Sequence, residues 1–88
     1  MIGQDREAYA AEALRAVIAQ VGPAAAGMAD LVDRIEKLDT LIDPVARRRA
    51  LVAIARDCRE AARPYGVDLR RILYGAANLL DQGGYLTE

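Results

Sequence analysis

Few side chains in this sequence could do covalent chemistry, and the residue types that are missing are as informative as those present. The 88 residues include one cysteine, Cys58, and no histidine or serine. Serine–histidine and cysteine–histidine catalysis each need a base beside the nucleophile, so neither is available within this chain. We therefore expect no enzyme activity from the chain alone, and we expect Cys58 to be a small buried hydrophobe.

The same inventory excludes the usual structural zinc site, because Cys58 is the only soft ligand and no imidazole can complete a tetrahedron. A metal would need carboxylates alone, and the spacing of the carboxylates does not gather them around a pocket. No glycine-rich phosphate-binding loop is present. We expect neither a metal nor a cofactor.

Arginine is the polar residue that the sequence concentrates in one segment. On a helical wheel, five arginines of residues 44–63 fall within an arc of about 100°: Arg48, Arg49, Arg56, Arg59 and Arg63. Val45 and Val52 lie inside that arc. Such a basic, partly apolar stripe suits an acidic protein surface or a phosphate backbone, because guanidinium presents a planar fork of donors.

A plainer interpretation of this stripe is a solvated flank. The arginine stems would then cover Val45 and Val52, and the guanidinium groups would meet acids of the preceding helix, namely Asp33, Glu36 and Asp39. The distribution of charge along the chain is compatible with both interpretations of the stripe. Residues 1–43 carry eight acids and four bases (net −4), and residues 44–88 carry five acids and eight bases (net +3). This separation indicates either a contact with a partner or packing of the two halves on each other.

Residues 59–78 have the spacings of a helix-turn-helix, with a small residue, a turn glycine, a cap and an aliphatic at Ala62, Gly66, Asp68 and Ile72. In this alternative, the outward face of the second helix binds DNA through Arg70, Arg71, Tyr74 and Asn78. Pro64 departs from the pattern, because it ends the first helix two residues before the turn glycine.

Three further residues are candidate partner contacts because exposed aromatic side chains favour interfaces: Tyr9, Tyr85 and, beside it, Leu86. They could instead fill gaps in the core. That core is thin, since 18 of the hydrophobic residues are alanine, and small helical domains of this kind often gain stability by packing on a second chain. We therefore expect a homo-oligomer or a subunit of a larger complex.

Four segments show helical periodicity and none shows the alternation of a strand. They cover about residues 5–21, 24–42, 44–63 and 69–82, followed by a tail at 83–88. Asp5, Asp43 and Asp68 are the expected N-caps, and Gly22 and the pair Gly83–Gly84 are the expected ends. We predict a single all-α domain over residues 1–88, a small four-helix bundle with short loops and antiparallel neighbours. Three long helices with an arm are the second choice.

Apolar stripes identify the expected core. The second segment repeats Met28, Leu31, Ile35, Leu38 and Ile42 at spacings of three and four. The third presents Leu51, Ile54, Ala55, Cys58 and Ala62 on one face. On the surface of the second segment, the pairs Asp30–Arg34 and Asp33–Lys37 are spaced to support the helix as i,i+4 ion pairs.

From these features we expect a non-enzymatic helical protein–protein interaction module, a small subunit, adaptor or inhibitor that self-associates. The alternative from another class is a helix-turn-helix regulator that binds DNA. A single cysteine gives no internal disulfide, and we recognise neither a signal peptide nor a membrane-spanning segment. We therefore expect a cytoplasmic protein without a membrane partner.

Overall fold

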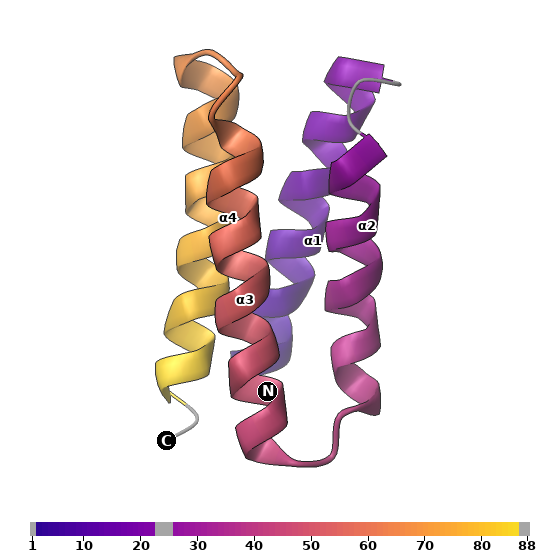
Figure 1. Cartoon of the computed structure of the whole chain (residues 1–88), viewed down its shortest axis with the longest axis vertical. Helices are drawn as coiled ribbons and strands as arrows, with labels where there is room; N and C mark the ends of the chain where they lie inside the picture. Colours follow the sequence, from indigo (N-terminus) through magenta and orange to yellow (C-terminus); the bar gives the residue numbers. More distant parts are fainter. Residues whose placement is uncertain (1, 23–25, 87–88) are drawn as a thin grey trace.

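The computed structural model describes the backbone of residues 2–22 and 26–86, and the side chains of residues 6–22 and 27–81. Within these residues the chain forms α1 (Ile2–Val21), α2 (Ala26–Glu36), the short 3-10 helix η2 (Lys37–Thr40), α3 (Pro44–Ala62) and α4 (Val67–Leu86). Successive α-helices run antiparallel and pack on each other (Figure 1). Helix α4 also packs along α1, which closes the bundle. The predicted all-α four-helix bundle is confirmed.

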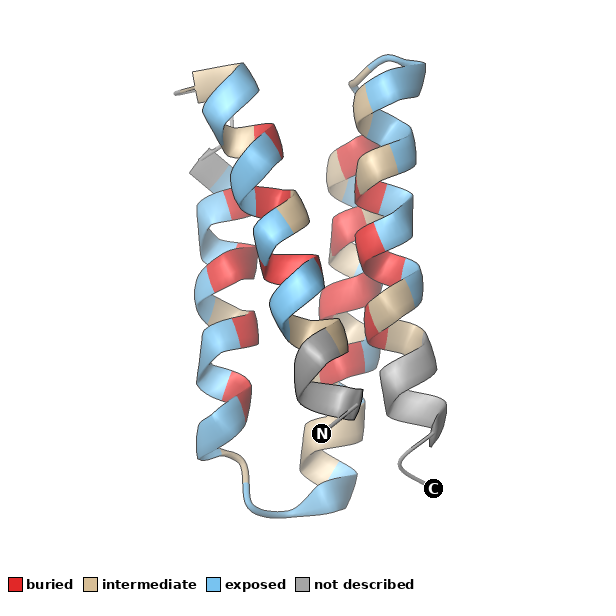
Figure 2. Cartoon of the chain, turned by 180° about the vertical axis from the view of Figure 1, so that it is seen from behind, coloured by how far each residue is buried: buried red, intermediate tan, exposed pale blue. Residues whose placement is uncertain are grey.

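The core lies where the apolar faces of the four helices meet, and Figure 2 shows the buried residues on the inward faces of the helices. Among the described residues every buried side chain is apolar. The largest side chains that are fully buried include Leu14, Leu38, Leu51, Ile54, Leu73 and Leu80. Buried alanines on three helices let the backbones approach closely: Ala10, Ala55, Ala62, Ala76 and Ala77.

Two predicted helix ends have the expected local chemistry. Asp43 is the N-cap of α3, and its carboxylate accepts a hydrogen bond of 3.2 Å from the Val45 amide. Pro44 follows in the first turn, where its missing N–H costs nothing. Gly22 follows α1 with φ of 72°, the left-handed conformation that glycine adopts without strain at a helix C-terminus.

The prediction of one helix over residues 24–42 is wrong at its C-terminal end. Helix α2 gives way to η2, in which the Thr40 hydroxyl donates to the Lys37 carbonyl at 2.6 Å. The tighter turn keeps Leu38 buried, and Leu41 still packs against the core, but the chain leaves the core at the next residue. Ile42 is consequently 96% exposed and does not belong to the apolar seam. The expected start at residues 24 and 25 lies outside the described residues.

Three other boundaries also differ from the prediction. Helices α1 and α4 begin at Ile2 and Val67, so Asp5 and Asp68 lie inside them and are not N-caps. Asp68 remains in the first turn of α4, where the macrodipole favours negative charge. Helix α4 continues through the predicted glycine stop to Leu86, because each glycine costs only about 1 kcal/mol in a helix and no proline follows. Residues 83–86 of the predicted tail are therefore helical.

Candidate protein-interaction surfaces

The first half of the predicted arginine stripe forms one surface. We define the α3 basic face as the shallow depression lined by Val45, Arg48, Arg49, Val52, Ala53 and Arg56. Val45 and Val52, one heptad apart, are 44% and 43% exposed, so both leave apolar surface in water. No carboxylate of the described residues lines the depression. The α3 basic face is thus an exposed aliphatic pair framed by three guanidinium groups.

The second half of the stripe has other contacts. Arg59 Nη2 lies 2.6 Å from Asp81 Oδ2 and donates to Asn78 Oδ1 at 2.9 Å, which ties α3 to α4. Arg63 Nη1 lies 3.6 Å from the Glu60 carboxylate on its own helix. Both arginines were predicted to point at a partner or at the acids of the second helix, and the structure gives them partners elsewhere.

The charged pairs of α2 follow the prediction in part. Lys37 Nζ lies 2.9 Å from Asp33 Oδ2, as expected for an i,i+4 pair. Arg34, expected to pair with Asp30, instead donates to Asp57 Oδ2 on α3 at 2.7 Å. This guanidinium lowers the pKa of Asp57 below its usual range.

Arg47 is the residue that the sequence reasoning missed. Its Nη1 donates to the Leu38 carbonyl at 2.6 Å, and its Nη2 bonds both Glu7 carboxylate oxygens at 2.5 and 2.7 Å. Asp39 Oδ1 lies 3.9 Å from the same nitrogen. The available signal was its position four residues before Leu51, on the buried side of α3. An arginine in that position must find partners in a neighbouring helix.

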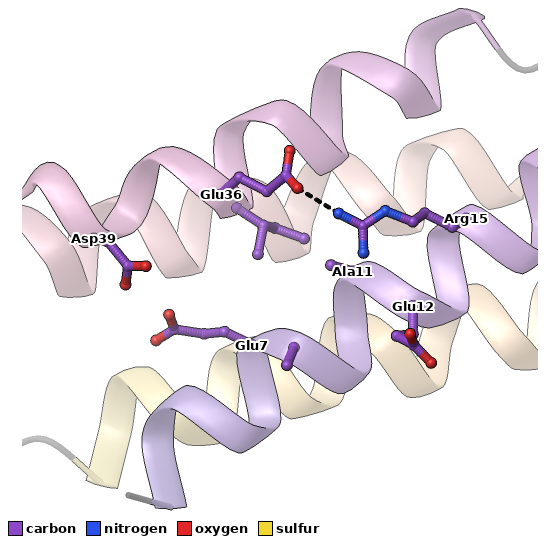
Figure 3. A pocket seen from close by; sticks show the side chains of 8 residues that line it. Glu7, Ala11, Glu12, Arg15, Glu36 and Asp39 are labelled. Carbon is purple, nitrogen blue, oxygen red and sulfur yellow. Dashed lines mark hydrogen bonds and ion pairs between the residues drawn. The ribbon is translucent and has the colours of Figure 1, made fainter.

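A second surface lies between α1 and the α2–η2 segment (Figure 3). We call it the acidic groove, and its lining is Glu7, Ala8, Ala11, Glu12, Arg15, Ile35, Glu36 and Asp39. Arg15 crosses it to an ion pair with Glu36. Glu7 and Asp39 point from opposite elements into the same space, and Glu12 makes no hydrogen bond or ion pair with the described residues. Arg47 pairs with Glu7 and Arg15 pairs with Glu36, so Glu12 and the exposed Asp39 make the groove acidic.

The outward side of α4 collects the residues of the DNA-binding alternative, since Arg70, Arg71, Tyr74 and Asn78 share one surface depression with Val67 and Gly75. Asn78 already accepts from Arg59, and Arg70 Nη2 donates to the Arg63 and Tyr65 carbonyls at 3.1 and 3.0 Å. Helices α3 and α4 form an antiparallel hairpin (Figure 1), whereas helix-turn-helix pairs cross near 90–120°. The geometry does not favour DNA binding, which stays a prediction.

Of the predicted contacts Tyr9, Tyr85 and Leu86, only Tyr9 has a described side chain. Tyr9 is 66% exposed on α1 but lines neither the acidic groove nor the α3 basic face. Tyr85 and Leu86 lie in the last turn of α4, and their side chains are outside the described residues. Their predicted role in binding therefore has no structural observation behind it.

The remaining reactive group is inaccessible. Cys58 is fully buried, and burial raises the pKa of its thiol to about 11. At neutral pH the group is a protonated hydrophobe and not a nucleophile. In the described part of the chain, no group of three or more potential ligands could hold a metal ion. Nor does any helix there combine the length and the apolar character needed to cross a bilayer.

Comparison of the chain with protein-family models, with curated proteins and with solved structures found no match.

Proposed function

We propose that this chain is a non-enzymatic helical interaction module that binds an acidic surface of a partner protein through the α3 basic face. The observation that carries the proposal is the exposed pair Val45 and Val52, framed by arginines in a depression whose described lining includes no carboxylate. Exposed aliphatic surface next to arginine is typical of interface centres, where arginine is enriched and carboxylates are depleted. The cations in the described lining of this surface are all arginines. Arginine can bind a carboxylate through two parallel hydrogen bonds, whereas lysine acts as a point charge.

The non-enzymatic part of the proposal rests on the side-chain inventory. The chain lacks histidine and serine, and its cysteine is buried with a raised pKa. A cytoplasmic location belongs to the same proposal, because a single buried thiol fits a reducing compartment. Binding of a partner is the function that remains for an exposed basic and apolar helix face.

The test is affinity capture from the native host followed by mass spectrometry, with a matched pair of variants. Val52→Glu places a carboxylate in the centre of the α3 basic face, and Val67→Glu makes the same change at an exposed valine on α4. We expect the native chain and Val67→Glu to capture the same acidic protein, and Val52→Glu to lose it. Equal capture by Val52→Glu, or no capture by the native chain, would overturn the proposal.

A further inference from the structure

The two halves of the chain carry opposite net charges of −4 and +3, and some of these charges meet where the halves pack. Among the described residues, Arg47 pairs with Glu7 and lies 3.9 Å from Asp39, and Arg34 pairs with Asp57. The exposed carboxylate of Glu12 takes no part in these contacts.

The other ion pairs described for the α3 arginines stay within the basic half. Arg59 pairs with Asp81, Arg63 with Glu60, and Arg56 lies 3.6 Å from Asp57 on its own helix. Arg49 is exposed and makes no hydrogen bond or ion pair with the described residues. The α3 basic face therefore keeps an exposed guanidinium group, that of Arg49, which takes no part in the contacts between the halves.

The two charged surfaces lie on opposite sides of the bundle. The acidic groove runs between α1 and the α2–η2 segment, whereas the α3 basic face is on the hairpin of α3 and α4. Figure 1 shows that hairpin on one side of the molecule and α2 on the other. One copy therefore cannot bring its own two surfaces together, but two copies can.

The surfaces also match in their side chains. The acidic groove offers Glu12, which makes no ion pair with the described residues, and Asp39, whose side chain is 74% exposed. Its α1 wall includes Ala8 and Ala11, small residues that allow the close approach of another helix. The α3 basic face carries guanidinium groups beside an aliphatic pair, and its described lining holds no carboxylate that would repel the groove.

We propose that the α3 basic face of one copy docks into the acidic groove of a second copy, so that chains associate head to tail. The inference uses the surface of the proposed function and names its occupant as this same chain. Such a contact is heterologous, because it joins two different surfaces, and it generates open chains or a ring and not a two-fold dimer. Its charged groups are exposed, so salt screens it.

The first measurement is sedimentation equilibrium of the native chain from about 10 μM to 1 mM protein, at about 20 mM and 500 mM salt. The Debye length is about 20 Å at the lower salt concentration and below 5 Å at the higher one, so the higher concentration screens exposed charges. We expect the weight-average mass to rise with concentration above the 9.5 kDa of the monomer at low salt, and to fall at high salt. A monomer at every concentration would overturn the proposal.

Two variants that each remove one surface make the test specific. Arg49→Glu reverses a charge on the α3 basic face, and Glu12→Arg reverses one in the acidic groove; both residues are exposed. We expect each variant alone to be monomeric and an equimolar mixture to associate, because each variant retains the surface that the other lacks. The controls Arg71→Glu and Asp30→Arg make the same charge changes outside both surfaces and should associate like the native chain.

Two outcomes would contradict the head-to-tail contact even if the chain self-associates. Association of Arg49→Glu alone would mean that the α3 basic face is not used, and failure of the mixture would mean a symmetric contact. Loss of association in the controls would show a net-charge effect and would also overturn it. A monomeric native chain that still captures an acidic host protein would leave the proposed function standing, so the two failures are distinguishable.

Discussion

Arg47 Nη2 lies 2.5 and 2.7 Å from the two carboxylate oxygens of Glu7, a residue forty positions earlier in the chain. The two side chains are 21% and 12% exposed, so the pair is largely shielded from water. Through its other nitrogen Arg47 also binds the Leu38 carbonyl. One side chain thereby joins α1, η2 and α3 at the end of the bundle where the loop before Asp43 leaves the core.

Replacing Arg47 should destabilise the fold, because the Glu7 carboxylate would remain shielded without a partner. We expect Arg47→Met to lower the free energy of unfolding by about 2 kcal/mol, measured by urea denaturation. Arg49→Met, at an exposed position, should change it by less than about 0.5 kcal/mol. Adding Glu7→Gln to Arg47→Met should recover part of the loss. Equal stability of the two arginine variants would contradict the role of Arg47.

The bond from Arg34 to Asp57 should make stability depend on pH in the acid range. Because Arg34 lowers the pKa of Asp57 below its unfolded value near 3.8, the pair stabilises the fold above that pH, and its contribution is lost as the pH falls through the folded pKa. Both side chains are about one-third exposed, so we expect less than about 1 kcal/mol. Carboxyl carbon NMR should show the pKa of Asp57 rising in Arg34→Gln, and an unchanged pKa would refute this coupling.

Burial of Cys58 should give a second pH dependence, at the alkaline end. The folded pKa of about 11 lies above the unfolded value near 9, so the stabilising effect is complete below pH 9 and is lost as the pH rises through 11. Urea denaturation should show this loss, of the order of 2 kcal/mol, in the native chain and not in Cys58→Ala. In the folded native chain, the thiol should react with an aromatic disulfide only as fast as the protein opens. Rapid reaction at pH 8 would show that the thiol is accessible.

Two glycines should respond in opposite directions to the same substitution. Gly22 has φ of 72°, which an alanine adopts only with strain, so Gly22→Ala should cost about 1 kcal/mol. Gly75 lies in the interior of α4, and a Cβ added there would meet no atom within 4 Å. Gly75→Ala should therefore stabilise the protein by about 0.5 to 1 kcal/mol. Thermal unfolding of the two variants measures both changes, and a loss at Gly75 would indicate an unrecognised contact.

The sequence was informative about the elements because helix formation depends on local patterns. The run from Asp43 to Val45 marks a helix start by its own chemistry, and Leu51, Ile54 and Cys58 mark a buried face by spacing alone. Helix ends were less predictable, because several local signals compete there. Asp68 has the chemistry of a cap but lies inside α4, and Ile42 continued an apolar repeat that the turn of η2 interrupts.

The candidate site was less predictable than the fold, because ion pairing depends on which helices become neighbours. The sequence placed Arg59 and Arg49 on one stripe, yet only the packing of α3 on α4 brings Arg59 to Asp81. Arg47 binds a residue on α1, and no local spacing relates the two. The helical wheel correctly grouped Val45 and Val52 with the neighbouring arginines, because all of these residues lie on a single helix.

The two arginines at the start of α4 separate a structural role from the DNA-binding alternative. Arg70 donates to the carbonyls of Arg63 and Tyr65 and so completes the C-terminal end of α3, whereas Arg71 is exposed. We expect Arg70→Met to lower the free energy of unfolding by about 1 kcal/mol and Arg71→Met to leave it unchanged. A DNA-binding surface would instead make both residues contribute to retention on heparin, with steep salt dependence. Equal loss of heparin retention in two equally stable variants would favour that alternative over the capping role of Arg70.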